Sequence, residues 1–109
     1  MTGLSRPRPR HKFKARACES DGIKFPSLLE ARYYAQLKLR EKAGEVLFFL
    51  RQTPFHLPGG VKYVVDFTVF LADGSIEFID TKGKDTLLSS SKRKQVEALY
   101  PIEIKIVKA

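Results

Sequence analysis

The sequence predicts an α/β domain in which two helices flank a mixed central sheet, with a short basic arm in front of it. Two observations predict this fold. Segments with helical composition and capping residues are interspersed with apolar, strand-like segments in the order α-β-β-β-α-β. The last helix and strand form a crossover that returns the chain to the sheet, as right-handed connections do, which makes the sheet mixed. At 109 residues the chain has the length of one domain.

The arm comprises residues 1–16, and the domain comprises residues 17–109. The arm holds six cationic side chains and two prolines but no acidic residue. A segment so charged and so poor in apolar residues does not order by itself, so we expect a flexible tether to nucleic acid. A merely solubilising tail is the alternative. The candidate DNA contacts in the arm are Arg6, Arg8, Arg10, Lys12, Lys14 and Arg16.

A small β-ribbon and a helix are predicted next. Residues 17–25 contain Asp21-Gly22, a hairpin-type turn signal. Ser27 and Glu30 have the spacing of a capping box, so we expect a helix that starts directly after Ser27. Its residues favour helix as far as about Ala43, and the glycine that follows is a typical stop.

Three predicted strands follow this helix. Glu45–Gln52 is rich in apolar residues and predicts a buried strand, which Thr53-Pro54 ends. Val61–Leu71 and Ile76–Lys82 predict a hairpin joined by the turn at residues 72–75.

The last elements are a loop, a short helix and a strand. Residues 84–91 predict the loop, and the helix extends from about Lys92 to Leu99, where Pro101 ends it. Ile102–Val107 alternates between apolar and charged residues and predicts a strand with one apolar face.

Basic residues cluster at the start of this last helix. Lys92, Arg93 and Lys94 would place positive charge against the positive end of the helix dipole, which is locally unfavourable. Contact with DNA phosphates would explain that arrangement, and a solvated face is the alternative. Lys84, in the loop before the helix, is a further candidate for contact with the DNA backbone.

The charge balance also indicates the class of partner. Twenty Lys and Arg residues against twelve Asp and Glu favour a polyanion, with nucleic acid before an anionic membrane surface. No apolar run approaches the roughly 20 residues of a membrane-spanning helix, and no apolar segment of a secretory signal follows the basic start. A single cysteine, Cys18, excludes an internal disulfide and a multi-cysteine zinc site. We therefore expect a cytoplasmic protein with no membrane partner.

Three charged side chains in the predicted hairpin indicate its chemistry. Asp80 and Lys82 lie on one face of the second strand, and in normal register Asp66 of the first strand lies near Asp80. Two convergent carboxylates attract a divalent cation, and a neighbouring lysine can orient or activate a water. This combination hydrolyses phosphodiesters. For Asp80 and Lys82 the alternative is a cross-strand ion pair at an exposed edge of the sheet. For Asp66 the alternative is a strand aspartate satisfied by a neighbouring lysine or a backbone amide.

The order of elements, with an aspartate on the second strand and Asp-x-Lys on the third, resembles the PD-(D/E)xK nuclease superfamily. Within it, the chain is most similar to small phage-encoded nucleases related to phage endonuclease I and archaeal Holliday-junction resolvases. The resemblance implies a restriction-endonuclease-like core and a metal-dependent DNA endonuclease. It implies that Asp66 and Asp80 bind Mg²⁺ or Mn²⁺, with the backbone carbonyl of Thr81, and that Lys82 serves the attacking water. Several members add a glutamate on the first helix, and the resemblance therefore implies that Glu30 is a further metal ligand. The alternative is that Glu30 only caps the helix.

The resemblance also implies the substrate and the partners. It implies branched or junction DNA, a homodimer with two-fold symmetry, and the bacterial host cytoplasm if the protein is phage-encoded. The apolar run Val46–Leu50 and the helix of residues 28–43 would supply the dimer interface, unless they are buried within the monomer. Gln52 either contacts a water or phosphate or is an ordinary polar residue at a strand end. The alternatives are a monomeric nicking or sequence-biased phage nuclease and a non-catalytic nucleic-acid-binding protein.

Overall fold

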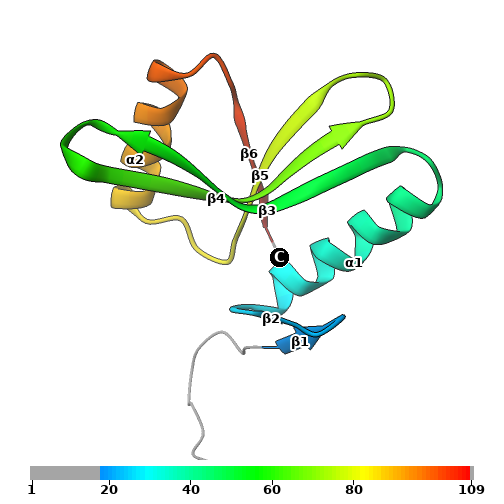
Figure 1. Cartoon of the computed structure of the whole chain (residues 1–109). Coiled ribbons are helices and arrows are strands. Elements are labelled where there is room, and N and C mark those ends of the chain that lie inside the picture. The colour runs from blue at the N-terminus through cyan, green and yellow to red at the C-terminus, as the bar shows by residue number, and fades with distance from the viewer. Residues whose placement is uncertain (1–17, 109) are drawn as a thin grey trace, which may run out of the picture.

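The structure is a computed structural model that describes residues 18–108 (Figure 1). A two-stranded ribbon precedes the first helix, and a four-stranded mixed sheet forms the centre of the domain. After the ribbon, the elements follow the predicted order α-β-β-β-α-β. They are β1 (Cys18–Ser20), β2 (Ile23–Phe25), α1 (Leu28–Lys42), β3 (Val46–Leu57), a short 3-10 turn (Pro58–Gly60), β4 (Val61–Leu71), β5 (Ile76–Lys82), α2 (Leu87–Leu99) and β6 (Ile104–Lys108).

The ribbon and the first helix form where the sequence predicts them. Asp21 and Gly22 make the turn between β1 and β2 with φ of 53° and 76°, and left-handed residues of this kind suit a two-residue hairpin turn. Ser27 caps α1, because its Oγ accepts a hydrogen bond of 3.1 Å from the backbone N–H of Glu30.

The sheet has the strand order β3-β4-β5-β6, in which β6 is parallel to β5 and the other pairs are antiparallel. The prediction of a mixed sheet is therefore confirmed, and β4 and β5 have the predicted bounds. The prediction that the first strand ends at Gln52 is wrong, because β3 continues through Pro54 and His56 to Leu57. Proline has no backbone N–H to donate, and an edge strand accommodates it because only one side of that strand is paired.

The second helix starts earlier than predicted. Residues 84–91 do not form one loop, because Thr86 caps α2 and its Oγ1 accepts a hydrogen bond of 3.1 Å from the backbone N–H of Ser89. Lys92–Lys94 therefore lie inside α2, and their predicted place at its N-terminus, with the argument from the helix dipole, is wrong. β6 begins at Ile104, later than predicted. Neither helix in residues 18–108 is long and apolar enough to cross a membrane.

Two hydrophobic clusters occupy opposite faces of the sheet. One packs against α1 and includes Ile79 of β5, and the other packs against α2 and includes Phe78 at its margin. Neighbouring residues of a strand point to opposite faces, so α1 and α2 cover opposite faces, as Figure 1 shows. The buried residues are Phe25, Ala31, Tyr34, Leu37, Val46, Phe67, Val69 and Ile79 in the first cluster, and Leu57, Tyr63, Val65, Val96 and Ile104 in the second.

Candidate functional site

Asp66 and Asp80 meet where β4 and β5 stop pairing. The last pair of the ladder is Phe67–Ile79, and the next pair in the same register would be Asp66–Asp80. At that point the side chains bridge the two strands instead. Asp66 Oδ2 accepts hydrogen bonds from the backbone N–H (2.9 Å) and the hydroxyl (2.8 Å) of Thr81, while Asp80 Oδ1 accepts one from the backbone N–H of Asp66 (2.9 Å). The structure thus brings the two predicted carboxylates together.

Asp80 is the more deeply buried of the two carboxylates, with 1% of the residue exposed. Its Oδ2 accepts a hydrogen bond from the hydroxyl of Tyr63. Burial is the largest influence on the pKa of Asp80 and raises it, and the charge of Asp66 raises it further. The hydrogen bonds and the charge of Lys82 act in the opposite direction. An ionised carboxylate in this position therefore favours a cation beside it.

Tyr63 and Lys82 lie next to Asp80. Burial raises the pKa of Tyr63 well above its ordinary value, and the hydrogen bond to Asp80 adds to this, so Tyr63 stays a hydrogen-bond donor at neutral pH. Lys82 is half-buried, and its Nζ lies 6.0 Å from the centroid of the Tyr63 ring. Among the ion pairs of the described residues, none involves Lys82. Its ammonium is thus available to a ligand or a water.

Glu30 reaches the same region from the first turn of α1, and only 3% of it is exposed. Its Oε2 accepts a hydrogen bond of 3.1 Å from the side chain of Gln52 and lies 3.5 Å from Nη2 of Arg51. Burial raises the pKa of Glu30, followed by the charge of Asp66 and, more weakly, that of Asp80, while Arg51 lowers it. The carboxylate is thus turned toward the sheet and its partners lie on β3, so capping alone does not explain this residue.

β3 and β4 are irregular at the level of Asp66. Val65 packs in the cluster against α2, whereas Phe67, two residues later, packs in the cluster against α1. In an uninterrupted strand these two side chains would share a face. The ladder between β3 and β4 skips the pair Gln52–Asp66, and Gln52 has a φ of 56°. The reversal of faces occurs at this pair. Here the Gln52 side chain donates to Glu30, and the Asp66 carboxylate accepts from Thr81.

The left-handed backbone at Gln52 predicts an inverted order of stabilities. Gln52→Gly and Gln52→Val both lose the hydrogen bond from Gln52 to Glu30. We expect the free energy of unfolding of Gln52→Val to lie about 2 kcal/mol or more below that of Gln52→Gly, because glycine adopts positive φ without strain and a β-branched residue is a strong outlier there. Urea denaturation of the two variants measures the difference. An ordinary strand prefers valine to glycine, so a more stable valine variant would contradict the strain at this position.

Arg51 is a component that the sequence analysis missed. Its guanidinium carbon lies 4.6 Å from the centroid of the Phe25 ring, and the side chain contacts Glu30. Its Nε is buried and has no hydrogen-bond partner in residues 18–108. A cation directly after the apolar start of β3 was the signal in the sequence.

The predicted basic DNA contacts differ in their surroundings. Arg93 forms a two-pronged ion pair with Asp85, at 3.2 Å and 2.7 Å, and only 14% of its side chain is exposed. Lys84 and Lys94 are exposed and Lys92 is half-buried, so these three remain accessible to a polyanion. The arm residues Arg6, Arg8, Arg10, Lys12, Lys14 and Arg16 lie outside the described residues.

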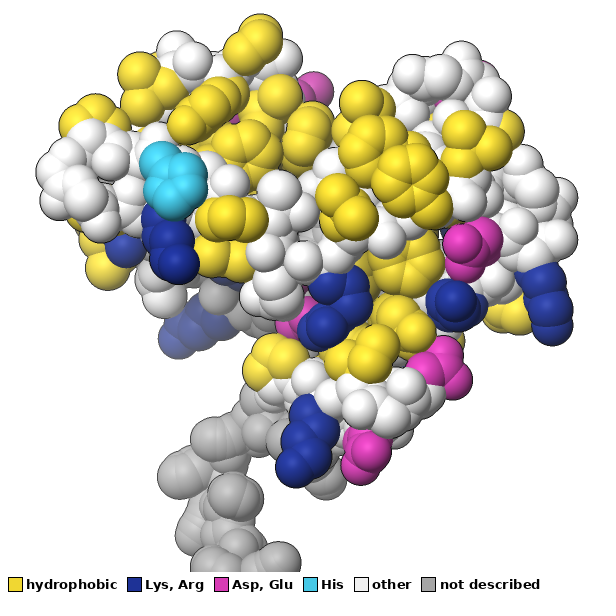
Figure 2. Space-filling model, viewed as in Figure 1, with side chains coloured by type: hydrophobic (Ala, Val, Ile, Leu, Met, Phe, Trp, Pro, Cys, Tyr) yellow, Lys and Arg dark blue, Asp and Glu magenta, His cyan; other side chains and the backbone are white. Residues whose placement is uncertain are grey.

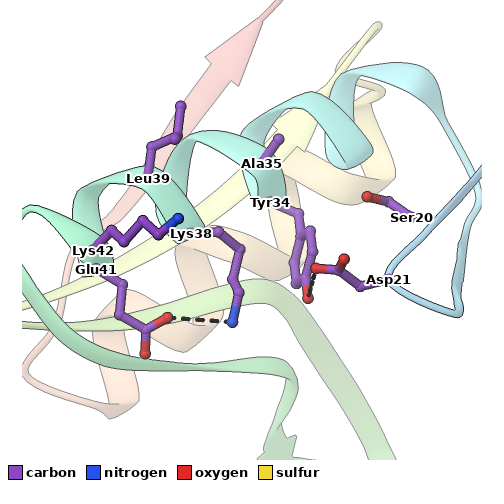
Figure 3. A pocket seen from close by; sticks show the side chains of 8 residues that line it. All are labelled: Ser20, Asp21, Tyr34, Ala35, Lys38, Leu39, Glu41 and Lys42. Atoms are coloured by element: carbon purple, nitrogen blue, oxygen red, sulfur yellow. Dashed lines mark hydrogen bonds and ion pairs between the residues drawn. The ribbon is translucent and has the colours of Figure 1, made fainter.

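A surface hollow of about 590 Å³ lies apart from the carboxylates, between the β1–β2 turn and α1 (Figure 3). The hydroxyl of Tyr34 donates a hydrogen bond of 3.0 Å to Asp21 at one end, and Lys38 pairs with Glu41 at 3.4 Å at the other. Neither Asp66, Asp80 nor Lys82 lines it. The charged site of the hairpin is therefore a separate feature.

The donor set of the hairpin fits Mg²⁺. No three His, Cys, Asp or Glu side chains within residues 18–108 lie close enough together to hold a metal by themselves. Magnesium, however, uses only one or two carboxylates and keeps several waters. Asp66 Oδ1 receives no hydrogen bond from the described residues, and Oδ1 and Oδ2 of Asp80 accept one each, which leaves a second lone pair on both of these oxygens. Asp66 and Asp80 thus supply the hard oxygen donors of such a site.

Comparison with known proteins gives one match. Residues 10–109 match the model of the DUF1064 family, which is described as "Protein of unknown function (DUF1064)". This match covers most of the chain, so the protein belongs to the DUF1064 family. No curated protein and no solved structure matches the chain.

Proposed function

We propose that this DUF1064 protein is a divalent-metal-dependent DNA endonuclease with the restriction-endonuclease-like core of the PD-(D/E)xK superfamily. One observation carries the proposal. Where the β4–β5 ladder ends, the carboxylate of Asp66 accepts a hydrogen bond from β5, and that of Asp80 accepts one from β4. Lys82 follows Asp80 by two residues on β5, and Glu30 faces the site from α1. Groups from both faces of the sheet converge on one pair of carboxylates, which an ion pair at an exposed edge would not require.

The chain's own residues would divide the reaction among them. Asp66 and Asp80 would hold Mg²⁺ or Mn²⁺, with the carbonyl of Thr81 as a further donor and Glu30 in contact through a coordinated water. The bound ion supplies a Lewis acid and lowers the pKa of a coordinated water. Lys82 orients the attacking water and offsets negative charge on the phosphorane as it forms. Hydrolysis then needs no covalent bond between protein and DNA.

Several basic groups would hold the substrate. The chain has a formal net charge of +8, which favours a polyanion. The arm, Lys84, Lys92 and Lys94 would contact phosphates in any sequence and supply affinity without base readout. Arg93 is engaged with Asp85 and would instead hold the segment between β5 and α2 in place.

We further propose that the protein acts as a homodimer on branched or junction DNA. In the apolar run at the start of β3, Val46 is buried, but Leu47, Phe48 and Leu50 are 60%, 46% and 48% exposed. They lie on β3, an edge strand, and Figure 2 shows apolar side chains gathered on the side of the molecule that faces the viewer. A second copy that covered this surface would remove it from water and relate two sites by one two-fold axis.

The proposal is tested with linear duplex, nicked duplex and four-way junction DNA, each with Mg²⁺, Mn²⁺ or EDTA. We expect cleavage only with a metal, and paired symmetric cuts near the branch point of the junction. Light scattering should show a dimer. A monomer, or equal cutting of linear and branched DNA, would remove the junction specificity and leave a monomeric nicking or sequence-biased nuclease. DNA binding without any cleavage would overturn the nuclease.

That last outcome describes a non-catalytic nucleic-acid-binding protein. One observation favours it: hydrogen bonds to the carboxylates of Asp66 and Asp80 join β4 to β5, which gives both side chains a structural role. In that case the two carboxylates are structural, and the basic residues alone account for function.

A further inference from the structure

Tyr63 contacts both charged residues of the Asp80-Thr81-Lys82 segment. It lies on β4, and only 6% of it is exposed. Its hydroxyl donates a hydrogen bond to Asp80 Oδ2, and its ring centroid lies 6.0 Å from Nζ of Lys82, within the range of a cation–π contact. One side chain therefore contacts both the carboxylate and the ammonium.

Tyr63 is in turn supported from α2. The Arg93 guanidinium donates two hydrogen bonds to Asp85, which hold the Arg93 side chain in place. The positive charge of Arg93 lowers the pKa of Tyr63, and the hydroxyl of Tyr63 donates a hydrogen bond to Asp80. This arrangement links the segment after β5 and the second helix to the carboxylate site.

We propose that Tyr63 is a positioning residue of the nuclease site, whose hydroxyl holds the Asp80 carboxylate in the orientation that receives the metal ion. The inference rests on the proposed function. An Asp carboxylate turns readily about its last torsion, so a donor on Oδ2 fixes the direction in which the remaining lone pairs point. Partners of this kind contribute about 10–100-fold to metal affinity or activity in metalloproteins.

The test compares Tyr63→Phe with Tyr100→Phe in the full chain. Both changes remove one hydroxyl and keep the ring, and both tyrosines pack with the cluster against α2. The hydroxyl of Tyr100, however, donates to the backbone carbonyl of His56 at 2.9 Å, away from the carboxylates. Isothermal titration with Mn²⁺ in the absence of DNA is the first measurement. We expect Tyr63→Phe to weaken Mn²⁺ binding about 10-fold or more and Tyr100→Phe to change it less than about twofold.

Two further measurements separate positioning from general loosening. In an Asp80→Asn background, Tyr63→Phe should weaken Mn²⁺ binding no further, because the carboxylate it positions is gone. In cleavage assays, Tyr63→Phe should lower kcat with KM for DNA unchanged.

The outcomes distinguish this inference from the proposed function. Wild-type protein that neither binds Mn²⁺ nor cuts DNA overturns the function and this inference with it. Wild-type protein that does both, with Tyr63→Phe binding Mn²⁺ equally well or more tightly, overturns the inference alone. Equal losses in the Tyr63→Phe and Tyr100→Phe variants would also overturn it, since they would reflect only loosened packing.

Discussion

Asp66→Asn, Asp80→Asn and Lys82→Ala are each expected to lower the rate of metal-dependent DNA cleavage by about 10²–10⁴-fold, with folding largely intact. The first two changes remove ligand charge at nearly constant shape. The third removes the ammonium that serves the attacking water, and no ion pair of the described residues is lost with it. Single-turnover cleavage of the preferred DNA with Mg²⁺ measures the rates, and circular dichroism checks the fold.

Matched controls are available on the same sheet. Asp73 lies in the exposed turn between β4 and β5, and its carboxylate accepts hydrogen bonds from the backbone N–H and the hydroxyl of Ser75, so Asp73→Asn should cut DNA at the wild-type rate. Lys105→Ala serves the same purpose for the lysine, since Lys105 is exposed and pairs with Glu77 at 2.8 Å. Cleavage by Asp66→Asn at near the wild-type rate would refute the site assignment.

The second large effect expected is stabilisation by the metal itself. A ligand that binds only the folded state at ten times its dissociation constant adds about 1.4 kcal/mol to the free energy of unfolding. For a domain of this size that raises Tm by about 6–11 °C. We expect Mg²⁺ or Mn²⁺ to do so in wild type and in Asp73→Asn, but not in Asp66→Asn. Differential scanning calorimetry without DNA measures it, and equal shifts in all three proteins would place any bound metal elsewhere.

This stabilisation should depend on pH in a defined direction. Burial raises the pKa of Asp80 and of Glu30, so these groups take up protons at a higher pH than ordinary carboxyl groups. Protons compete with the metal, so the shift in Tm should shrink as the pH falls through these raised values. Without metal the sign reverses: the folded state binds the protons more tightly than the unfolded state, so these two groups cost stability at neutral pH and less at acid pH. The opposite trend would contradict the burial of these carboxyl groups.

The hairpin shows how much of the site is present in the sequence. The apolar period of two residues and the intervening turn residues define β4 and β5, and these signals are local, so both strands have the predicted bounds. Register then places Asp66 near Asp80, and the structure brings them together. The capping residue Ser27 is likewise a local signal, and α1 starts where it indicates.

Two of the wrongly predicted boundaries, the start of α2 and the end of β3, lie where the local sequence signal is misleading. Thr86 caps α2, but the serine-rich residues after it have weak helix preference, so the sequence alone favours a later start. Pro54 reads as a strand end, and only the position of β3 at the edge of the sheet lets the strand continue through it. The cap at Thr86 in the first case, and the position of β3 at the sheet edge in the second, override the local preference of a few residues.

Local patterns thus determined the order of elements and the proximity of Asp66 to Asp80, because periodicity and turn residues act between near neighbours in the chain. The tertiary structure decided the rest of the site. Gln52 takes a left-handed backbone, and the alternation of β4 reverses at Asp66, so Glu30 meets β3 on one face while Tyr63 meets Asp80 on the other. Such contacts join residues that are far apart in the chain, and they depend on strand order and on the irregularity between β3 and β4, neither of which has a local signature.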